Sequence, residues 1–214
     1  ALGSGSTSAR ERIVVVDPSH HVRLVDGAVF YAGLRAEPAF AGPELNVEGA
    51  VVAGERLRLF QRGNGSAASG VAPVHAVGDL ELRHFVDWID GVAEAPRLVS
   101  VLRFDLGEVG GVPLGFTDAA NLPDGRAVFL AAAEDSPDTY RDGAVLGARV
   151  GLLDGDRCLL AEIVDDRGRP TPLKLEGIDH LATSPSGALE LVVVADMDDP
   201  HQPAVMATLV WDPR

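Results

Sequence analysis

A hairpin plan that recurs three times along the sequence constrains the fold more than any other feature. In residues 116–135 an acidic strand start leads into a short apolar run, a Pro-Asp-Gly turn, a second apolar run and an acidic pair. The same plan recurs in residues 46–64, with the turn Ala53-Gly54-Glu55 and a polar end, and in residues 175–199, with the turn Pro185-Ser186-Gly187. Because Pro fixes φ and Gly adopts a positive φ, a Pro-Asp-Gly segment predicts a tight turn. Each repeat therefore predicts a β-hairpin.

Further short apolar runs follow each hairpin and extend it into a meander. We expect these additional strands near residues 71–77, 98–105, 148–153, 157–164 and 204–211. Ahead of the first repeat, residues 12–17 and 22–25 match a third and a fourth strand, and residues 1–6 match the end of a second. Repeated four-stranded units of this kind are typical of β-propeller blades.

The sequence therefore predicts an all-β fold, a β-propeller of four-stranded meander blades. We expect residues 1–214 to form the C-terminal portion of a longer single-domain propeller. The chain would supply two complete blades and two partial ones, out of roughly five or six in the intact ring. Residues 82–89 place apolar side chains at helical spacing, which predicts a short surface helix with Asp79 and Gly91 as its expected caps. A second short helix is expected near residues 29–35.

Composition limits the classes of partner. The formal net charge is −14, and such a chain repels nucleic acid and anionic membranes, so we expect neither as a partner. A single cysteine, Cys158, excludes an intrachain disulfide and favours a reducing compartment. We therefore expect the cytoplasm, or the periplasm if a signal precedes Ala1. No apolar run approaches the ~20 residues that a membrane helix needs.

The recurring acids at the strand starts are the first candidates for a site. In a propeller the first strand of each blade lines the central channel, so Glu48, Asp118 and Glu176 are expected around a common axis at equivalent heights. Converging carboxylates are the hard oxygen ligands that Ca²⁺ or Mg²⁺ prefers. The alternative is structural, because buried carboxylates commonly accept hydrogen bonds from backbone N–H groups of a neighbouring blade. Both interpretations stay open.

Polar residues at the ends of the second strands form another expected group, near the opposite mouth of the channel from the strand-start acids. These candidate ligand-binding residues are Arg62, Asn64, Glu134, Asp135 and Asp196. The histidines show no metal-ligand spacing, and His180 is the one that lies closest in sequence to a repeated acid. If the channel is catalytic, one of Asp118, Glu176 or His180 would act as the base.

Two short motifs resemble known propellers. Residues 46–50 and 175–178 resemble the Glu-Gly strand starts of the gluconolactonase/regucalcin superfamily and of esterase-like phytase propellers. Residues 117–126 resemble the Asn-Asp…Pro-Asp-Gly-Arg segment of the former, with Thr117 in place of the Asn. The resemblance implies a divalent metal held by Glu48, Asp118 and Glu176. Over most of the chain, the segments also resemble uncharacterised bacterial propeller proteins, which imply no activity.

Two functions follow as expectations. The first is a propeller that binds an unknown small molecule or protein, with structural acids at the strand starts. The second is a metal-dependent hydrolase of the lactonase or phosphoesterase type, in which the cation polarises a carbonyl or phosphoryl oxygen.

Overall fold

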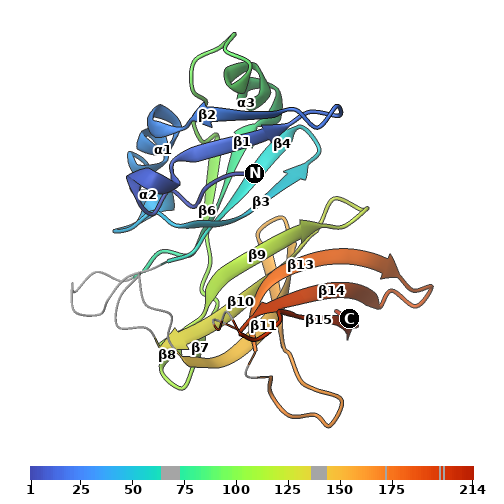
Figure 1. The fold of residues 1–214 in the computed structure, drawn as a ribbon. Coiled ribbons are helices and arrows are strands. Elements are labelled where there is room, and N and C mark those ends of the chain that lie inside the picture. The colour runs from blue at the N-terminus through green and yellow to red at the C-terminus, as the bar shows by residue number, and fades with distance from the viewer. Residues whose placement is uncertain (64–72, 136–143, 172, 198, 200) are drawn as a thin grey trace. The chain divides into compact units, whose positions relative to one another are not determined.

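A computed structural model describes residues 1–63, 73–135, 144–171, 173–197, 199 and 201–214. The chain forms two compact units, Ala1–Phe104 and Asp105–Arg214 (Figure 1), and each is described by itself. Within the described ranges every sheet is antiparallel, and none of the helices there is long and apolar enough to span a membrane.

The N-terminal unit is built on a four-stranded meander. Its strands follow chain order: β3 (Val47–Ala53), β4 (Arg56–Gln61), β5 (Ala76–Glu81) and β6 (Ser100–Arg103). Leu57 and Leu59 alternate toward the core on β4, which is the period-2 pattern of a half-buried strand. Directly opposite one another in the register, Arg58 and Asp79 form a two-bonded ion pair across β4 and β5 at 2.8 and 3.1 Å.

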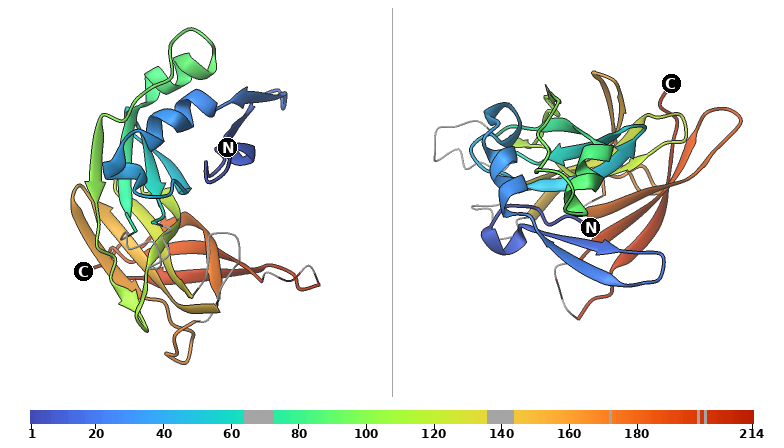
Figure 2. Two further views of the ribbon diagram at one scale, coloured as in Figure 1. Left: turned by 90° about the vertical axis from the view of Figure 1, so that its left-hand side faces the viewer. Right: turned by 90° about the horizontal axis from the view of Figure 1, so that it is seen from above.

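A smaller sheet and three helices complete this unit. Strands β1 (Arg12–Val16) and β2 (Val22–Asp26) pair with each other, and Leu2 bridges to Ile13 on the free side of β1. Helices α1 (Ala28–Arg35), α2 (Pro38–Ala41) and α3 (Leu82–Ile89) supply much of the core. Figure 2 shows α1 and α3 together, and Phe30 of α1 packs edge-on against Phe85 of α3 with ring centroids 5.6 Å apart.

The C-terminal unit stacks two larger meanders around a second core. The first sheet contains β9 (Gly115–Asn121), β10 (Ala127–Asp135), β11 (Ala144–Asp154) and β12 (Arg157–Glu162). The second contains β13 (Lys174–Thr183), β14 (Leu189–Asp196) and β15 (Val205–Trp211). Alternate residues of both sheets meet in one apolar cluster that includes Val128, Leu130, Leu191 and Val193. A two-stranded ribbon, β7 (Glu108–Val109) and β8 (Val112–Pro113), precedes them.

The tight turns form where the sequence predicts them. Gly125 and Gly187 adopt φ of 88° and 93°, which L side chains rarely adopt. The Gly125 N–H donates to the Leu122 carbonyl at 3.1 Å, and the Gly187 N–H donates to the Ser184 carbonyl at 2.9 Å. Each turn therefore closes a four-residue bend between two antiparallel strands.

The three long hairpins share a β-bulge near the start of their first strand. The register between β3 and β4 skips Glu48, between β9 and β10 it skips Thr117, and between β13 and β14 it skips Glu176. A bulge leaves one residue unpaired and re-aims its side chain. The residue equivalent to Glu48 and Glu176 in the observed pairing is therefore Thr117, and Asp118 is equivalent to Gly49.

The fold prediction is confirmed at the level of an all-β chain of antiparallel meanders. Every strand expected between residues 98 and 211 is present, and both expected helices form as α1 and α3. Part of the strand expected at residues 71–77 lies outside the described residues, and β5 begins at Ala76. The prediction that Asp79 caps α3 is wrong, because Asp79 belongs to β5 and pairs with Arg58.

Candidate functional site

Asp118 joins two sheets of the C-terminal unit. Its Oδ2 accepts the backbone N–H of Ile178 on β13 at 2.8 Å. Next to it, the buried Thr117 hydroxyl donates to the Leu175 carbonyl at 2.8 Å. Burial raises the pKa of the Asp118 carboxyl, and the Ile178 N–H partly offsets this rise because it favours the charged form. This contact is the structural alternative expected for a strand-start acid.

Glu176 lies in a separate polar cluster at strand ends. Its Oε1 is 3.1 Å from Nζ of Lys174, whose side chain is only 8% exposed. Burial raises the pKa of Glu176; Lys174 opposes the rise, and the charges of Asp196 and Glu134 add to it. The structure thus brings together three predicted residues, Glu176, Glu134 and Asp196, around a lysine that the sequence analysis missed. Lys174 is the only lysine in the sequence.

The other predicted residues have local partners or lie apart. Glu48 is in the N-terminal unit, where its Oε1 accepts from Asn46 Nδ2 at 2.6 Å. The Nε2 atom of His180 is 2.9 Å from the Thr183 hydroxyl on the same strand. Arg62 follows β4, and its backbone N–H donates to the Asn46 carbonyl at 2.9 Å. Asp135 is exposed at the end of β10, and Asn64 lies outside the described residues.

The described structure does not bring the carboxylates of Glu48, Asp118 and Glu176 together into a metal site. Among the residues that the structure describes, no three His, Cys, Asp or Glu side chains gather closely enough to hold an ion. Asp118 and Glu176 also have different neighbours, since Ile178 contacts the first and Lys174 the second. Calcium or magnesium binding at Glu48, Asp118 and Glu176 stays a prediction.

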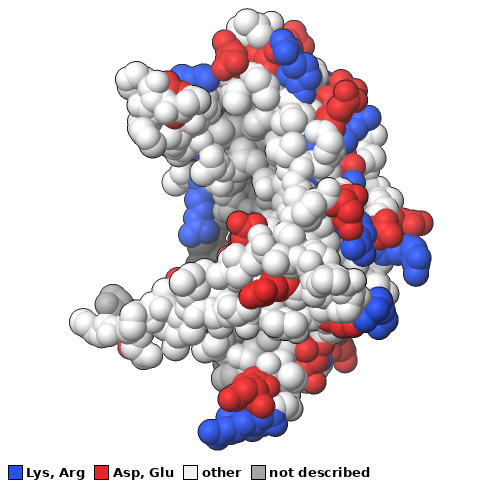
Figure 3. All heavy atoms as spheres, turned by 90° about the vertical axis from the view of Figure 1, so that its right-hand side faces the viewer, with Lys and Arg blue, Asp and Glu red and all other residues white. Residues whose placement is uncertain are grey.

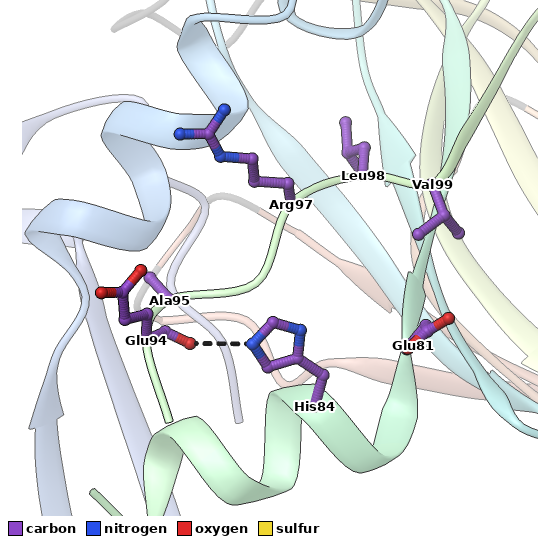
Figure 4. A pocket seen from close by; sticks show the side chains of 7 residues that line it. All are labelled: Glu81, His84, Glu94, Ala95, Arg97, Leu98 and Val99. Atoms are coloured by element: carbon purple, nitrogen blue, oxygen red, sulfur yellow. Dashed lines mark hydrogen bonds between the residues drawn. The ribbon is translucent and has the colours of Figure 1, made fainter. Parts of the chain in front are cut away.

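A cavity that the sequence analysis did not foresee lies in the N-terminal unit. Its volume is about 570 Å³, within the ~300–1,000 Å³ range of small-molecule sites. It lies between α3 and the segment that follows it, and seven side chains line it (Figure 4): Glu81, His84, Glu94, Ala95, Arg97, Leu98 and Val99. The lining combines two carboxylates, a guanidinium, an imidazole and three apolar side chains.

Arg97 distinguishes this cavity. Within the described part of the chain, no hydrogen bond or ion pair joins the exposed Arg97 side chain to another residue. His84 Nε2 lies 3.1 Å from the Glu94 carbonyl oxygen (Figure 4). Because a carbonyl oxygen only accepts, Nε2 carries the proton, and in the neutral ring Nδ1 remains an acceptor. The sequence offered no signal for this site, because Arg97 and His84 belong to no motif.

The surface charge is mixed rather than segregated on the face that Figure 3 shows, where Lys and Arg lie among Asp and Glu. At a net charge of −14, the chain is expected not to bind nucleic acid. The expectation itself stays a prediction.

Comparison with known proteins gives one match. A family model described as a family of unknown function, DUF6910, matches residues 1–200. The chain belongs to this family. No curated protein and no solved structure matches the chain. The resemblance to gluconolactonases and phytases is therefore untested by these comparisons, and membership of the family assigns no reaction.

Proposed function

We propose that this chain is part of a β-propeller that works as a binding protein, and that its N-terminal unit binds a small zwitterion. The observation that carries the ligand proposal is Arg97, a guanidinium without a protein partner in the described structure, on the wall of the cavity that His84 also lines. A guanidinium presents a planar set of donors that matches a carboxylate. A ligand carboxylate would give Arg97 the partner that the protein does not supply.

The other charged side chains of the cavity determine which kind of carboxylate ligand it favours. Glu81 and Glu94 outnumber Arg97, so these three side chains carry a net charge of −1 and disfavour a simple anion. Glu81 lies 3.5 Å from Arg56, and this ion pair leaves Glu94 as the carboxylate best placed for a ligand cation. A molecule with both a carboxylate and an ammonium group satisfies both ends. Leu98 and Val99 offer apolar contact to its side chain.

The repeat supports the propeller assignment. Two complete four-stranded meanders and one three-stranded meander follow each other along the chain in strict sequential strand order. Their first strands share a bulge at the same position of the pairing. Side-chain hydrogen bonds from Thr117 and Asp118 join two neighbouring meanders. These features are expected of consecutive propeller blades. We also propose the cytoplasm as the compartment, on the ground that a chain with one cysteine needs no oxidising environment.

Calorimetric titration with L-leucine tests the ligand proposal. Leucine carries the carboxylate, the ammonium and an apolar side chain. Two matched compounds each lack one charge: 4-methylpentanoate lacks the ammonium, and 3-methylbutylamine lacks the carboxylate. We expect saturable binding of leucine, with each matched compound at least about tenfold weaker, because tenfold corresponds to only ~1.4 kcal/mol of lost contact.

Two variants locate the binding site. Arg97→Gln should weaken leucine binding at least about tenfold, whereas Arg214→Gln, which removes an exposed arginine of the other unit, should leave it unchanged. If leucine shows no saturable heat up to ~10 mM, or if Arg97→Gln binds as the unaltered protein does, the proposal fails.

A further inference from the structure

The cavity of the N-terminal unit is formed by one continuous stretch of the chain. All seven lining residues fall between Glu81, the last residue of β5, and Val99. Helix α3 supplies His84 on one side, and the segment that follows the helix supplies Glu94 and Arg97 (Figure 4). The polar groups of the cavity are therefore positioned by contacts within this stretch.

The two ring nitrogens of His84 have different surroundings. Nε2 donates to the Glu94 carbonyl oxygen at 3.1 Å, and this contact between α3 and the following segment fixes the orientation of the ring. Figure 4 shows Nδ1 turned away from that carbonyl, toward the cavity. Among the residues that the structure describes, no hydrogen bond or ion pair joins Nδ1 to another group. The cavity therefore contains an oriented nitrogen that the protein leaves for a ligand.

This nitrogen and the carboxylates of the cavity differ in what they can recognise. A carboxylate such as that of Glu94 attracts any cation through its charge. In a neutral imidazole ring whose Nε2 holds the hydrogen, Nδ1 is an uncharged acceptor. It bonds a cation only if that cation carries an N–H group. The carboxylates therefore select for positive charge, and Nδ1 of His84 selects among cations.

We propose that His84 is a specificity-determining residue that restricts the site to amino acids with a free amine and excludes betaines, in which the nitrogen is fully methylated. The inference rests on the proposed function, because the ligand is the zwitterion whose carboxylate Arg97 binds. Nδ1 of His84 accepts one N–H of the ligand ammonium. A trimethylated nitrogen in the same place would displace water from Nδ1 and give it no hydrogen bond, and an acceptor left unpaired in this way costs free energy.

Calorimetric titration with L-leucine and with its N,N,N-trimethyl betaine tests this selectivity. The two compounds share the carboxylate, the apolar side chain and one positive charge, and they differ in the N–H groups. The titrations are done at pH 8, where an imidazole is neutral and Nδ1 is an acceptor. We expect leucine to bind at least about tenfold more tightly than the betaine, because a hydrogen bond to a charged group contributes a factor of this size.

Substitutions of His84 separate the hydrogen bond from the bulk of the methyl groups. His84→Phe keeps a planar ring and removes the acceptor, so the preference for leucine should fall to about threefold or less, also because an aromatic face attracts a quaternary ammonium. His84→Asn should restore part of the preference, since its amide oxygen lies as many bonds from Cα as Nδ1 does. His201→Phe replaces an exposed histidine of the other unit and is the matched control, which should keep the full preference.

The failure of this inference is distinguishable from the failure of the proposed function. If leucine binds and the betaine binds equally well, or if His84→Phe keeps the full preference for leucine, the role of His84 is overturned while the zwitterion site stands. If leucine does not bind the unaltered protein, both are overturned. His84 is exposed, so the circular dichroism spectra of its variants should match that of the unaltered protein. Should His84→Phe not fold, an undiminished preference in His84→Ala would overturn the inference in the same way.

Discussion

Replacing the buried side chain of Gln61 should strongly destabilise the N-terminal unit. Gln61 ends β4, and its side chain is fully buried. Its Nε2 donates to the carbonyls of Glu44 at 2.8 Å, Arg62 at 2.9 Å and Ala41 at 3.3 Å. Its Oε1 accepts the backbone N–H of Asn46 at 2.9 Å. One side chain therefore bonds three backbone groups of the segment that leads into β3 and the carbonyl of Arg62 after β4, and its two N–H groups are shared among the three carbonyls.

The substitution Gln61→Met keeps the length of the side chain and removes every one of these bonds. Two of the orphaned groups, the Asn46 N–H and the Ala41 carbonyl, belong to buried residues that water does not reach. Each buried unsatisfied group costs ~1–3 kcal/mol, so the free energy of unfolding should fall by about 2–6 kcal/mol. At roughly 3 °C per kcal/mol, the melting temperature should fall by roughly 10 °C.

Urea denaturation followed by circular dichroism measures this change. The matched control is Gln202→Met, because Gln202 is exposed and its side chain bonds the exposed loop residue Asp199; the free energy of unfolding should change by less than ~0.5 kcal/mol. A second variant, Gln61→Glu, keeps an acceptor for Asn46 but turns a carboxylate toward three carbonyls. The folded-state pKa of that carboxyl should rise, so this variant should recover stability as the pH falls. If Gln61→Met unfolds within ~0.5 kcal/mol of the unaltered protein, the hydrogen-bond reasoning is refuted.

Three further predictions concern titrating groups and metal. Burial raises the pKa of the Cys158 thiol from 9.0 to about 11, so its thiolate fraction near neutral pH should be about 100-fold below that of an unperturbed thiol. Its rate of alkylation by iodoacetamide should fall by the same factor, and a rate equal to that of a short peptide thiol would contradict this. The pKa of Asp118 is raised in the folded state, so the folded protein binds the proton more tightly than the unfolded chain does. The free energy of unfolding of the unaltered protein, relative to that of Asp118→Asn, should therefore increase as the pH falls from 7 toward 4. A decrease measured by urea denaturation would contradict this prediction. Millimolar calcium should leave the melting temperature unchanged, because Asp118 and Glu176 already have protein partners. A rise in melting temperature that both a chelator and Asp118→Ala abolish would instead establish a metal site.

Strand positions were predictable from the sequence because their determinants are local. The alternation of apolar residues in a segment such as 189–195 and the Pro-x-Gly turns at 123–125 and 185–187 depend on neighbours in the chain. The helix at residues 82–89 followed from apolar side chains at i, i+3, i+4 and i+7. The capping role expected of Asp79 failed for a nonlocal reason, since its partner Arg58 is on another strand.

The candidate site was predictable only in part, because it depends on contacts between distant segments. The pairing of Glu134 with Asp196 follows from their shared position at second-strand ends, whereas the proximity of Glu176 to both was not predicted, because the repeat groups Glu176 with the strand-start acids. The ion pair that holds Glu176, and the network around Gln61, depend on side-chain directions that no periodicity encodes. Among the described residues no side chain or backbone group pairs with the Arg97 guanidinium, and such an absence is not visible in a sequence.

The bulge shared by the three hairpins changes the interpretation of the acidic residues at the strand starts. Spacing alone groups Asp118 with Glu48 and Glu176, but the observed pairing puts Thr117 at their position and Asp118 one residue later. Thr117 is uncharged, yet it also finds a polar partner, the Leu175 carbonyl. Since a hydroxyl occupies the same bulge as two carboxylates, the position requires a polar side chain rather than a negative charge. A ring of metal ligands would require the charge, so the bulge favours the structural interpretation of these residues and directs the search for function to the Arg97 cavity.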